Sequence, residues 1–211
     1  MTDQDFSQMR RAMVDSQLRT NNVNDPRLIA ALSDVPRERF VPAEARVVAY
    51  IDRPVPLGGR RWLNAPLATA RLLAEARPVS GDRVLVVGSA TGYAAAVLAK
   101  LGAAVTALEE DPALVPVEMP GVTYVSGPLV EGWSAGAPYD LILIDGAVAS
   151  VPKAISGQLV DGGRLATGVI ERGVSRLAIG RRAGSGFGLV TVLDAEAVTL
   201  PGFAPPPEFQ F

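Results

Sequence analysis

The spacing of hydrophobic and polar positions changes along the chain. Up to residue 66, apolar residues recur at helical spacing in segments that prolines interrupt. From residue 83, short apolar runs alternate with helical stretches. Strands that alternate with helices predict a mostly parallel sheet with helices on both faces. The pattern therefore predicts an α/β fold with a helical N-terminal extension.

The N-terminal part is expected to hold three helices. Ser7 is the expected cap of a first helix that ends near Arg19. Asp25 followed by Pro26 predicts the start of a second helix, because proline is favoured at the first helical position. A third helix is expected to start at Asn64.

The remaining chain contains seven segments with the composition of strands. They cover residues 83–87, 103–108, 121–125, 139–145, 164–169, 174–181 and 187–199. Helices are expected at 91–101 and near 151–159. We expect a single domain, made of the extension 1–66, a core 67–200 and an extended, proline-rich tail 201–211.

Composition narrows the possible chemistry. The 211 residues include no histidine and no cysteine, which excludes Ser-His and Cys-His nucleophiles, imidazole or thiolate metal sites, and disulfides. Twenty basic and 22 acidic residues give a net charge of −2, unlike the basic balance of a dedicated nucleic-acid binder. The start does not resemble a signal peptide, and no apolar run approaches the roughly 18 residues of a membrane span. We therefore expect a cytoplasmic protein that binds no metal, nucleic acid or membrane.

A candidate ligand site follows the first strand of the expected sheet. Gly88 and Gly92 lie in the turn between this strand and the next helix, at the sheet edge where doubly wound folds bind ligands. Glu109 ends the second strand and is placed to accept hydrogen bonds from a ribose diol, as in NAD and S-adenosylmethionine sites. The turn lacks the third glycine of a dinucleotide fingerprint, which favours S-adenosylmethionine over NAD. A turn without any ligand is the remaining alternative.

Four longer segments resemble a single family. The chain is similar to the protein-L-isoaspartate (D-aspartate) O-methyltransferases in residues 13–42, 49–59, 84–99 and 139–165. The first of these segments contains VPRERFVP, and the last ends in QLVDGGRL. This resemblance implies a class I methyltransferase fold, with a Rossmann-like seven-stranded sheet. It also implies transfer of the methyl group of S-adenosylmethionine to the carboxylate of isoaspartyl residues in damaged proteins. The expected partners are isoaspartyl-containing peptides or proteins.

The resemblance also implies two groups of site residues. The expected cofactor-binding residues follow the first two strands of the sheet and are Gly88, Ser89, Ala90, Gly92, Tyr93, Glu109 and Glu110. The family's active-site loop, I-G-x-G-Q-T-I-S-x-P, aligns with residues 57–66 and places Asn64 at the catalytic serine. The candidate substrate-binding residues of this loop are Arg60, Arg61, Trp62 and Leu63.

The active-site loop departs from the family pattern. Trp62 replaces a threonine, and either fills the peptide groove or is buried in the core. Asn64 replaces the serine, and either hydrogen-bonds a carboxylate or caps the following helix. Arg60 and Arg61 either clamp an anionic substrate or form a solvated pair.

The cofactor side departs from the family pattern as well. Val86 stands where an acid is usual, and Ala90 replaces the middle glycine, which is tolerated where φ is negative. Residues 127–129 replace a G-D-G sequence and lose an acid that helps to place the adenosine. Asp145 follows the fourth strand, either as a contact for the cofactor's amino group or as a turn acid. Two alternative functions therefore remain: a paralogue with reduced or no activity that serves binding or regulation, and a methyltransferase with another acceptor.

Overall fold

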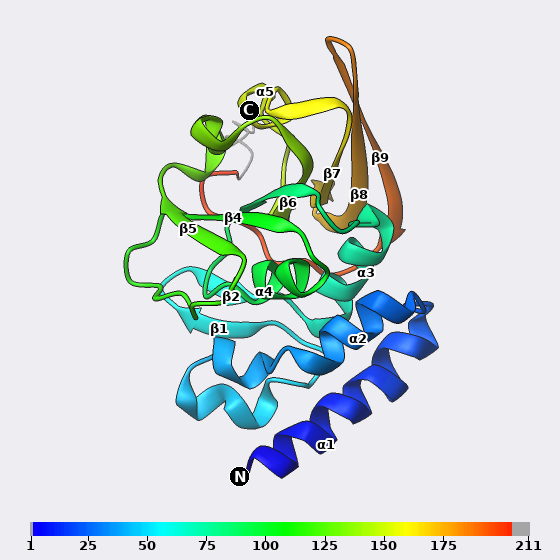
Figure 1. The fold of residues 1–211 in the computed structure, drawn as a ribbon, viewed down its shortest axis with the longest axis vertical. Helices are drawn as coiled ribbons and strands as arrows, with labels where there is room; N and C mark the ends of the chain where they lie inside the picture. Colours follow the sequence, from blue (N-terminus) through cyan, green and yellow to red (C-terminus); the bar gives the residue numbers. More distant parts are fainter. Residues whose placement is uncertain (1, 204–211) are drawn as a thin grey trace, which may run out of the picture.

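A seven-stranded sheet forms the centre of the molecule (Figure 1). The computed structural model describes residues 2–203. The strands of this sheet are β3 (Arg83–Val87), β4 (Ala104–Glu109), β5 (Val122–Ser126), β6 (Tyr139–Val148), β7 (Leu159–Glu171), β8 (Val174–Ala183) and β9 (Gly186–Asp194). Their order is β5-β4-β3-β6-β7-β8-β9. The pairings are parallel from β5 to β7 and antiparallel from β7 to β9, which confirms the predicted α/β class.

The central strand is buried on both of its faces. Val84 and Val86 belong to one apolar core and Leu85 and Val87 to the other, and all four are fully buried. This arrangement explains the continuous apolar run of the sequence, because a parallel strand between two packed layers exposes neither face.

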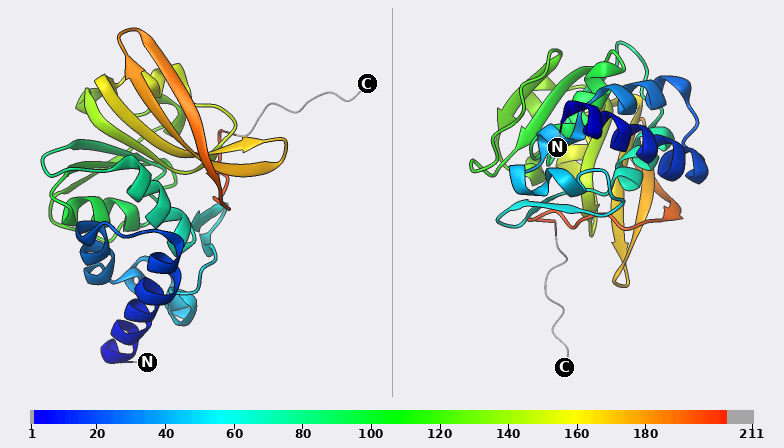
Figure 2. Two further views of the ribbon diagram at one scale, coloured as in Figure 1. Left: turned by 90° about the vertical axis from the view of Figure 1, so that its right-hand side faces the viewer. Right: turned by 90° about the horizontal axis from the view of Figure 1, so that it is seen from below.

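One core lies between the sheet and a layer of helices. Helices α3 (Pro66–Ala76) and α4 (Tyr93–Lys100) cover this face, and α2 (Pro26–Asp34) packs against both of them. Helix α1 (Asp3–Met13) lies further out, so the N-terminal helices form an outer layer (Figure 2). The predicted cap of α2 is confirmed, since the Asp25 carboxylate accepts the backbone N–H of Arg27 at 2.8 Å.

The first helix starts earlier than expected. Its cap is Thr2, whose hydroxyl accepts the N–H of Asp5 while the Asp5 carboxylate accepts the N–H of Thr2. This reciprocal pair satisfies two amides at the start of the helix. Ser7 lies inside the helix, where its hydroxyl donates to the carbonyl oxygen of Asp3, so the prediction of Ser7 as the cap is wrong. Helical geometry continues past α1 through a π-helical segment, Val14–Leu18.

The opposite face of the sheet is covered mainly without helices. The helix expected near 151–159 is reduced to α5 (Lys153–Ser156), because β7 begins at Leu159 and continues through Gly162 and Gly163. Gly162 has a φ of 75°, which allows this irregular stretch. Leu200 and Phe203 complete this second core from the C-terminal segment. Phe209 and Phe211, in the expected tail, lie outside the described residues.

A separate two-stranded ribbon precedes α3. It consists of β1 (Val55–Gly58) and β2 (Arg61–Leu63), which pair antiparallel in the stretch that the prolines mark as irregular. Among residues 2–203, no helix combines the length and the apolar composition that crossing a membrane requires.

Candidate active site

The site lies where the winding of the sheet reverses. Strand β3 has β4 on one side and β6 on the other, and ligands of doubly wound folds bind at such a point, outside the carboxyl ends of the strands. The register aligns these three strands, so that Gly88, Glu109 and Asp145 follow their last paired residues side by side. Two carboxylates and one backbone carbonyl are thus brought together at one edge.

The glycine turn after β3 has an unusual backbone. Gly88 and Gly92 have φ angles of 74° and 96°, where glycine is favoured. Alanine replaces glycine without strain only where φ is negative. Ala90 has a φ of 49°, so its backbone is strained. The backbone N–H of Ala90 donates to the Glu109 carboxylate at 2.7 Å, which ties this conformation to the end of β4.

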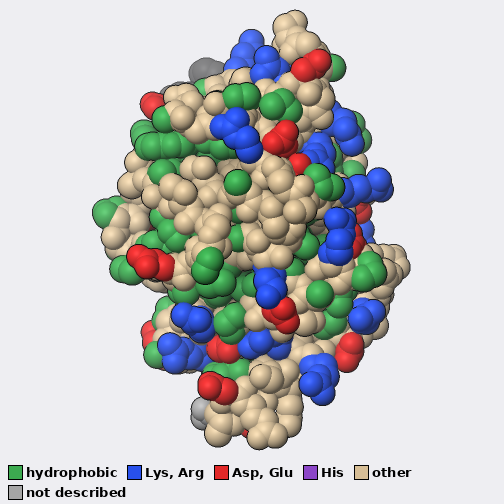
Figure 3. Space-filling model, viewed as in Figure 1, with side chains coloured by type: hydrophobic (Ala, Val, Ile, Leu, Met, Phe, Trp, Pro, Cys, Tyr) green, Lys and Arg blue, Asp and Glu red, His purple; other side chains and the backbone are tan. Residues whose placement is uncertain are grey.

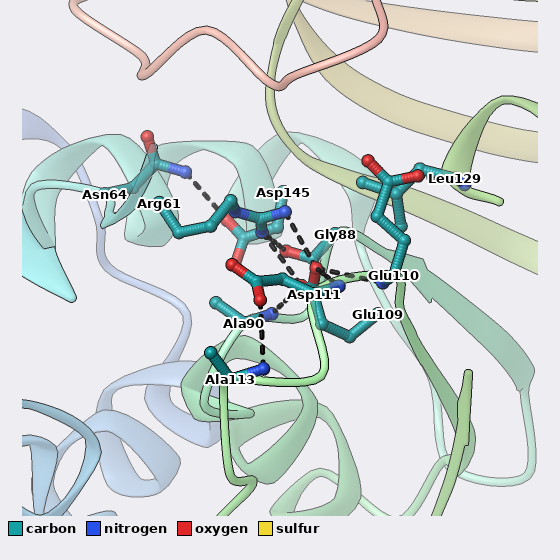
Figure 4. Close-up of polar contacts among 10 residues, drawn as sticks. All are labelled: Arg61, Asn64, Gly88, Ala90, Glu109, Glu110, Asp111, Ala113, Leu129 and Asp145. Atoms are coloured by element: carbon teal, nitrogen blue, oxygen red, sulfur yellow. Dashed lines mark hydrogen bonds and ion pairs between the residues drawn. The ribbon is translucent and has the colours of Figure 1, made fainter. Parts of the chain in front are cut away.

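Glu109 is held by its own backbone surroundings. Besides Ala90, the N–H groups of Glu110 and Asp111 donate to its carboxylate at 3.0 and 3.1 Å (Figure 4). The side chain is 11% exposed. Three amide donors fix the orientation of this carboxylate, which makes Glu109 a preformed hydrogen-bond acceptor.

Arg61 bonds the same carboxylate from the ribbon. Its Nη1 donates to Oε1 of Glu109 at 3.0 Å, and its Nη2 lies 3.0 Å from Oε2. Nη2 also donates to the carbonyl oxygen of Gly88 at 2.9 Å (Figure 4). Arg61 is 3% exposed, so the prediction of a solvated arginine pair is wrong for this residue, whereas Arg60 is exposed.

Asn64 links three parts of the chain. Its Nδ2 donates to Oδ1 of Asp145 at 2.9 Å, and its Oδ1 accepts the backbone N–H of Val198 at 2.9 Å. The residue that caps α3 is Ala65, without a side-chain hydrogen bond, so the helix-cap interpretation of Asn64 is wrong. Asn64 does donate to a carboxylate, but this carboxylate belongs to the chain itself, and a contact with a substrate carboxylate stays a prediction. The expected catalytic role of Asn64 stays a prediction.

Asp145 is buried within β6, directly after the last residue that pairs with β3. Burial raises the pKa of its carboxyl group, while the hydrogen bond from Asn64 and the positive charges of Arg61 and Arg37 oppose that rise. Asp145 therefore differs from Glu109, which three amides and a guanidinium surround. The interpretation of Asp145 as a turn acid is wrong, because β6 continues past it to Val148.

Arg37 is a residue of the site that we did not identify from the sequence. It is fully buried, and burial lowers the pKa of its guanidinium group. It donates to the carbonyl oxygens of Ala49 and Asn64, and it lies over the ring of Tyr93, 4.8 Å from the ring centroid. The sequence signal for this residue is its place in VPRERFVP, the motif through which residues 13–42 resemble the family. Arg37 thus supports the backbone of the active-site loop from below.

The other predicted residues take different places. Tyr93 packs in the core against Phe40, and Leu63 is also buried in that core. Trp62 is 45% exposed, so its interpretation as a core residue is wrong. Glu110 accepts the backbone N–H of Leu129 at 3.2 Å, and lies on the side of the site where an adenosine was expected. Ser89 is buried within the turn.

The C-terminal segment closes the site from above. Val198 and Leu200 form backbone hydrogen bonds with Ala147 at the end of β6. A Cβ atom at Gly88 would lie 3.0 Å from the δ-carbons of Leu200, and one at Gly146 would lie 2.5 Å from its γ-carbon. The absence of side chains at Gly88 and Gly146 therefore leaves room for the side chain of Leu200. The sequence pattern does not predict this contact.

The space that remains beside Glu109 is small. A cavity of about 190 Å³ is lined by residues that include Ala90, Glu109, Asp111 and Tyr124. Pockets that hold small ligands usually measure about 300–1,000 Å³. In this conformation the space beside Glu109 is therefore smaller than a typical ligand pocket.

The fold and the acid after β4 define a class I methyltransferase architecture. The sequence profile described as "Protein-L-isoaspartate(D-aspartate) O-methyltransferase (PCMT)" matches residues 8–198. "Protein-L-isoaspartate O-methyltransferase 2" of Marinobacter nauticus is 39% identical over 94% of this chain and 95% of its own. The chain therefore belongs to the protein-L-isoaspartate (D-aspartate) O-methyltransferase family.

Other relatives and solved structures agree with this family. "Protein-L-isoaspartate O-methyltransferase" of Methanoregula boonei is 35% identical over 86% of this chain and 87% of its own. A solved protein-L-isoaspartate O-methyltransferase superposes with a TM-score of 0.78, at 22% identity, over 92% of this chain and 66% of that one. A Plasmodium falciparum chain assigned to the same enzyme, in complex with S-adenosyl-L-homocysteine, superposes with a TM-score of 0.78, at 18% identity. The match covers 90% of this chain and 97% of that one. Both confirm the fold.

The acceptors at the site fit the cofactor of this family. S-adenosylmethionine carries hydroxyl donors on its ribose and an ammonium donor on its methionine part, and the Glu109 carboxylate and the Gly88 carbonyl accept such donors. The positive φ of Gly88 allows close approach to its backbone. In the present conformation both acceptors are bonded to Arg61.

Proposed function

We propose that this chain transfers a methyl group from S-adenosylmethionine to the carboxylate of an isoaspartyl residue, as a repair enzyme for damaged proteins. The observation that carries this proposal is the preformed Glu109 carboxylate beside Gly88 at the reversal point of the sheet. Membership of the family supports the acceptor, and favours this activity over an inactive paralogue or another acceptor.

The residues proposed to hold the cofactor lie around the turn after β3. Glu109 would bind the ribose, and Gly88 would accept the ammonium group. The adenosine would lie toward Glu110 and the turn after β5, where Pro128 has no N–H and the N–H of Leu129 is taken by Glu110. Recognition is therefore proposed to depend chiefly on Glu109.

The proposed reaction requires no general base. When bound, S-adenosylmethionine supplies an electrophilic methyl group, and an isoaspartyl carboxyl group, with a pKa near 4, is already ionised at neutral pH. The chain's own task is to place that carboxylate and to exclude water. A chain without histidine or cysteine can perform this task.

The surface agrees with a protein or peptide as the partner. On the face shown in Figure 3, basic and acidic side chains are interspersed, and the chain as a whole has a net charge of −2. Such a surface does not provide the electrostatic footprint of a nucleic-acid-binding protein. Action on peptides or proteins in the cytoplasm, without nucleic acid or membrane, is therefore part of the proposal.

Paired peptides test the proposed activity. Wild-type protein is incubated with methyl-labelled S-adenosylmethionine and either an isoaspartyl peptide or its normal aspartyl twin. We expect a base-labile methyl ester on the isoaspartyl peptide and none on the twin. Equal labelling of both peptides, or of neither, would contradict the proposal.

Glu109→Ala tests the cofactor part separately. Hydrogen bonds to a charged group contribute roughly 1.5–3 kcal/mol, so loss of the carboxylate is expected to weaken binding of S-adenosylhomocysteine by about 10- to 100-fold. Calorimetric titration measures this change. An affinity equal to that of the wild-type protein would show that Glu109 does not hold the ribose.

A further inference from the structure

Building on the proposed function, we propose that Arg61 is a specificity-determining latch. In the free protein it occupies Glu109 and Gly88, and in the loaded protein it binds the carboxylate of the acceptor. Cofactor and acceptor would then each favour the binding of the other.

The contacts of Arg61 match those required of the cofactor. A guanidinium presents planar N–H donors, and two of its nitrogens contact the two oxygens of Glu109 while one also reaches the Gly88 carbonyl. A ribose diol and an ammonium group would donate to the same acceptors. Arg61 therefore acts as an internal competitor for the cofactor.

The two partners of this ion pair depend on it unequally. Glu109 keeps three backbone N–H donors when Arg61 departs, so its carboxylate stays in place. For Arg61, the contacts found among residues 2–203 are those with Glu109 and Gly88. The arginine is thus the partner that cofactor binding displaces.

The element that carries Arg61 is suited to move. Strands β1 and β2 have four and three residues and form a ribbon apart from the main sheet. Gly58 and Gly59 join them with φ angles of 107° and 55°. The ribbon pairs with no strand of the central sheet, so its tip can move without breaking the pairing of that sheet, while Val55 and Leu63 keep it anchored in the core.

A displaced and buried guanidinium needs a new anion. Leaving one partner of a buried ion pair without the other is strongly unfavourable. Asp145 is the nearby alternative, but Asn64 already donates to it and burial favours its neutral form. The proposed reaction itself brings an anion to this edge of the sheet, namely the acceptor carboxylate, and a guanidinium binds carboxylates in a two-pronged geometry.

Calorimetry with three proteins tests the latch. S-adenosylhomocysteine is titrated into wild-type protein, Arg61→Gln and Arg53→Gln, each with and without a saturating isoaspartyl peptide. Arg53 is an exposed arginine just before the ribbon, so its substitution makes the same change of charge without touching the latch. Circular dichroism shows whether each variant is folded.

We expect Arg61→Gln to bind S-adenosylhomocysteine about tenfold more tightly than the wild-type protein in the absence of peptide, and Arg53→Gln to match the wild type. The peptide should tighten binding to the wild-type protein by about tenfold and leave Arg61→Gln unchanged. The proposal is overturned if Arg61→Gln binds no more tightly, or if the peptide affects both proteins equally.

Arg61→Lys keeps the test decisive if the glutamine variant does not fold. Lysine keeps the charge but loses the fork, so S-adenosylhomocysteine should bind more tightly than to the wild-type protein, and an unchanged affinity would overturn the latch. The titration without peptide does not depend on methyl transfer. A protein that binds S-adenosylhomocysteine as expected but labels no isoaspartyl peptide would defeat the proposed function and leave the competition between Arg61 and the cofactor standing.

Discussion

Two carboxylates on the strands that flank β3 have different surroundings. Glu109 accepts hydrogen bonds from three backbone N–H groups and pairs with a guanidinium. Asp145 is buried, with the amide of Asn64 as its hydrogen-bond donor, and its pKa is raised. The two carboxylates therefore differ in their donors: backbone amides and a guanidinium bond Glu109, and a neutral side-chain amide bonds Asp145.

Asp145→Asn is expected to change how stability depends on pH. Because burial raises the folded-state pKa of Asp145, its ionisation destabilises the folded protein as the pH rises from its ordinary value, 3.8, through the raised value. Asparagine cannot ionise, and its oxygen still accepts from Asn64. The free energy of unfolding of the variant should therefore rise relative to that of the wild type as the pH increases above about 4, as measured by urea unfolding. A difference that is constant with pH would contradict this.

Ala90→Gly is expected to stabilise the protein. A left-handed conformation costs a residue with a Cβ roughly 1–2 kcal/mol, part of which is offset by the greater freedom of glycine in the unfolded chain. The free energy of unfolding should rise by about 0.5–1 kcal/mol. As a control, Ala99→Gly within helix α4 should lower it by about the same amount. A loss of stability in Ala90→Gly would show that the strain at Ala90 is not relieved.

At the scale of elements, one side chain joins the active-site loop to the sheet and to the C-terminal segment. Asn64 reaches Asp145 in β6 and Val198 near the end of the described chain, while Arg37 holds its backbone carbonyl. These partners are distant in sequence. The active-site loop is therefore fixed at Asn64. The ribbon that precedes Asn64 in the chain contains Gly58 and Gly59.

Asn64→Ala is expected to destabilise the protein strongly. It leaves Asp145 and the N–H of Val198 without these buried hydrogen bonds, at a cost of roughly 2–4 kcal/mol in the free energy of unfolding. Asn24→Ala, at an exposed position, should change it by less than about 0.5 kcal/mol. Chemical denaturation measures both. A similarly small change for the two variants would mean that Asn64 does not hold these elements together.

At the scale of the whole molecule, the C-terminal segment completes both the second core and the site. Leu200 is 2% exposed, packs with the apolar side chains of β3 and β6, and lies over Gly88. Among residues 2–203, this face is covered by α5 and by short 3-10 or irregular segments, and Leu200 and Phe203 complete its apolar core. The site is thus assembled from residues that span most of the described chain.

Leu200→Ala is expected to lower the free energy of unfolding by about 2–5 kcal/mol, since it removes a buried leucine from a packed core. Val115→Ala, at a position that is 77% exposed, should stay within about 0.5 kcal/mol of the wild type. Thermal or urea unfolding compares the two. Equal stabilities would show that the C-terminal segment is not packed as described.

The sequence predicted features that depend on local order. The apolar run of β3 and the Asp25-Pro26 helix start arise from neighbouring residues, and both are observed. The contacts of Arg61 with Glu109 and of Leu200 with Gly88 bring together residues far apart in the chain. A periodic pattern contains no information about such pairs. For the same reason, Asn64 was read as a possible helix cap, although its partners lie in β6 and at Val198.

The most direct measurement is a crystal structure of the protein saturated with S-adenosylhomocysteine. The account predicts that the Glu109 carboxylate accepts hydrogen bonds from the ribose hydroxyls, and that Arg61 has left both Glu109 and Gly88. A ligand bound elsewhere, with the contacts between Arg61 and Glu109 intact, would contradict it.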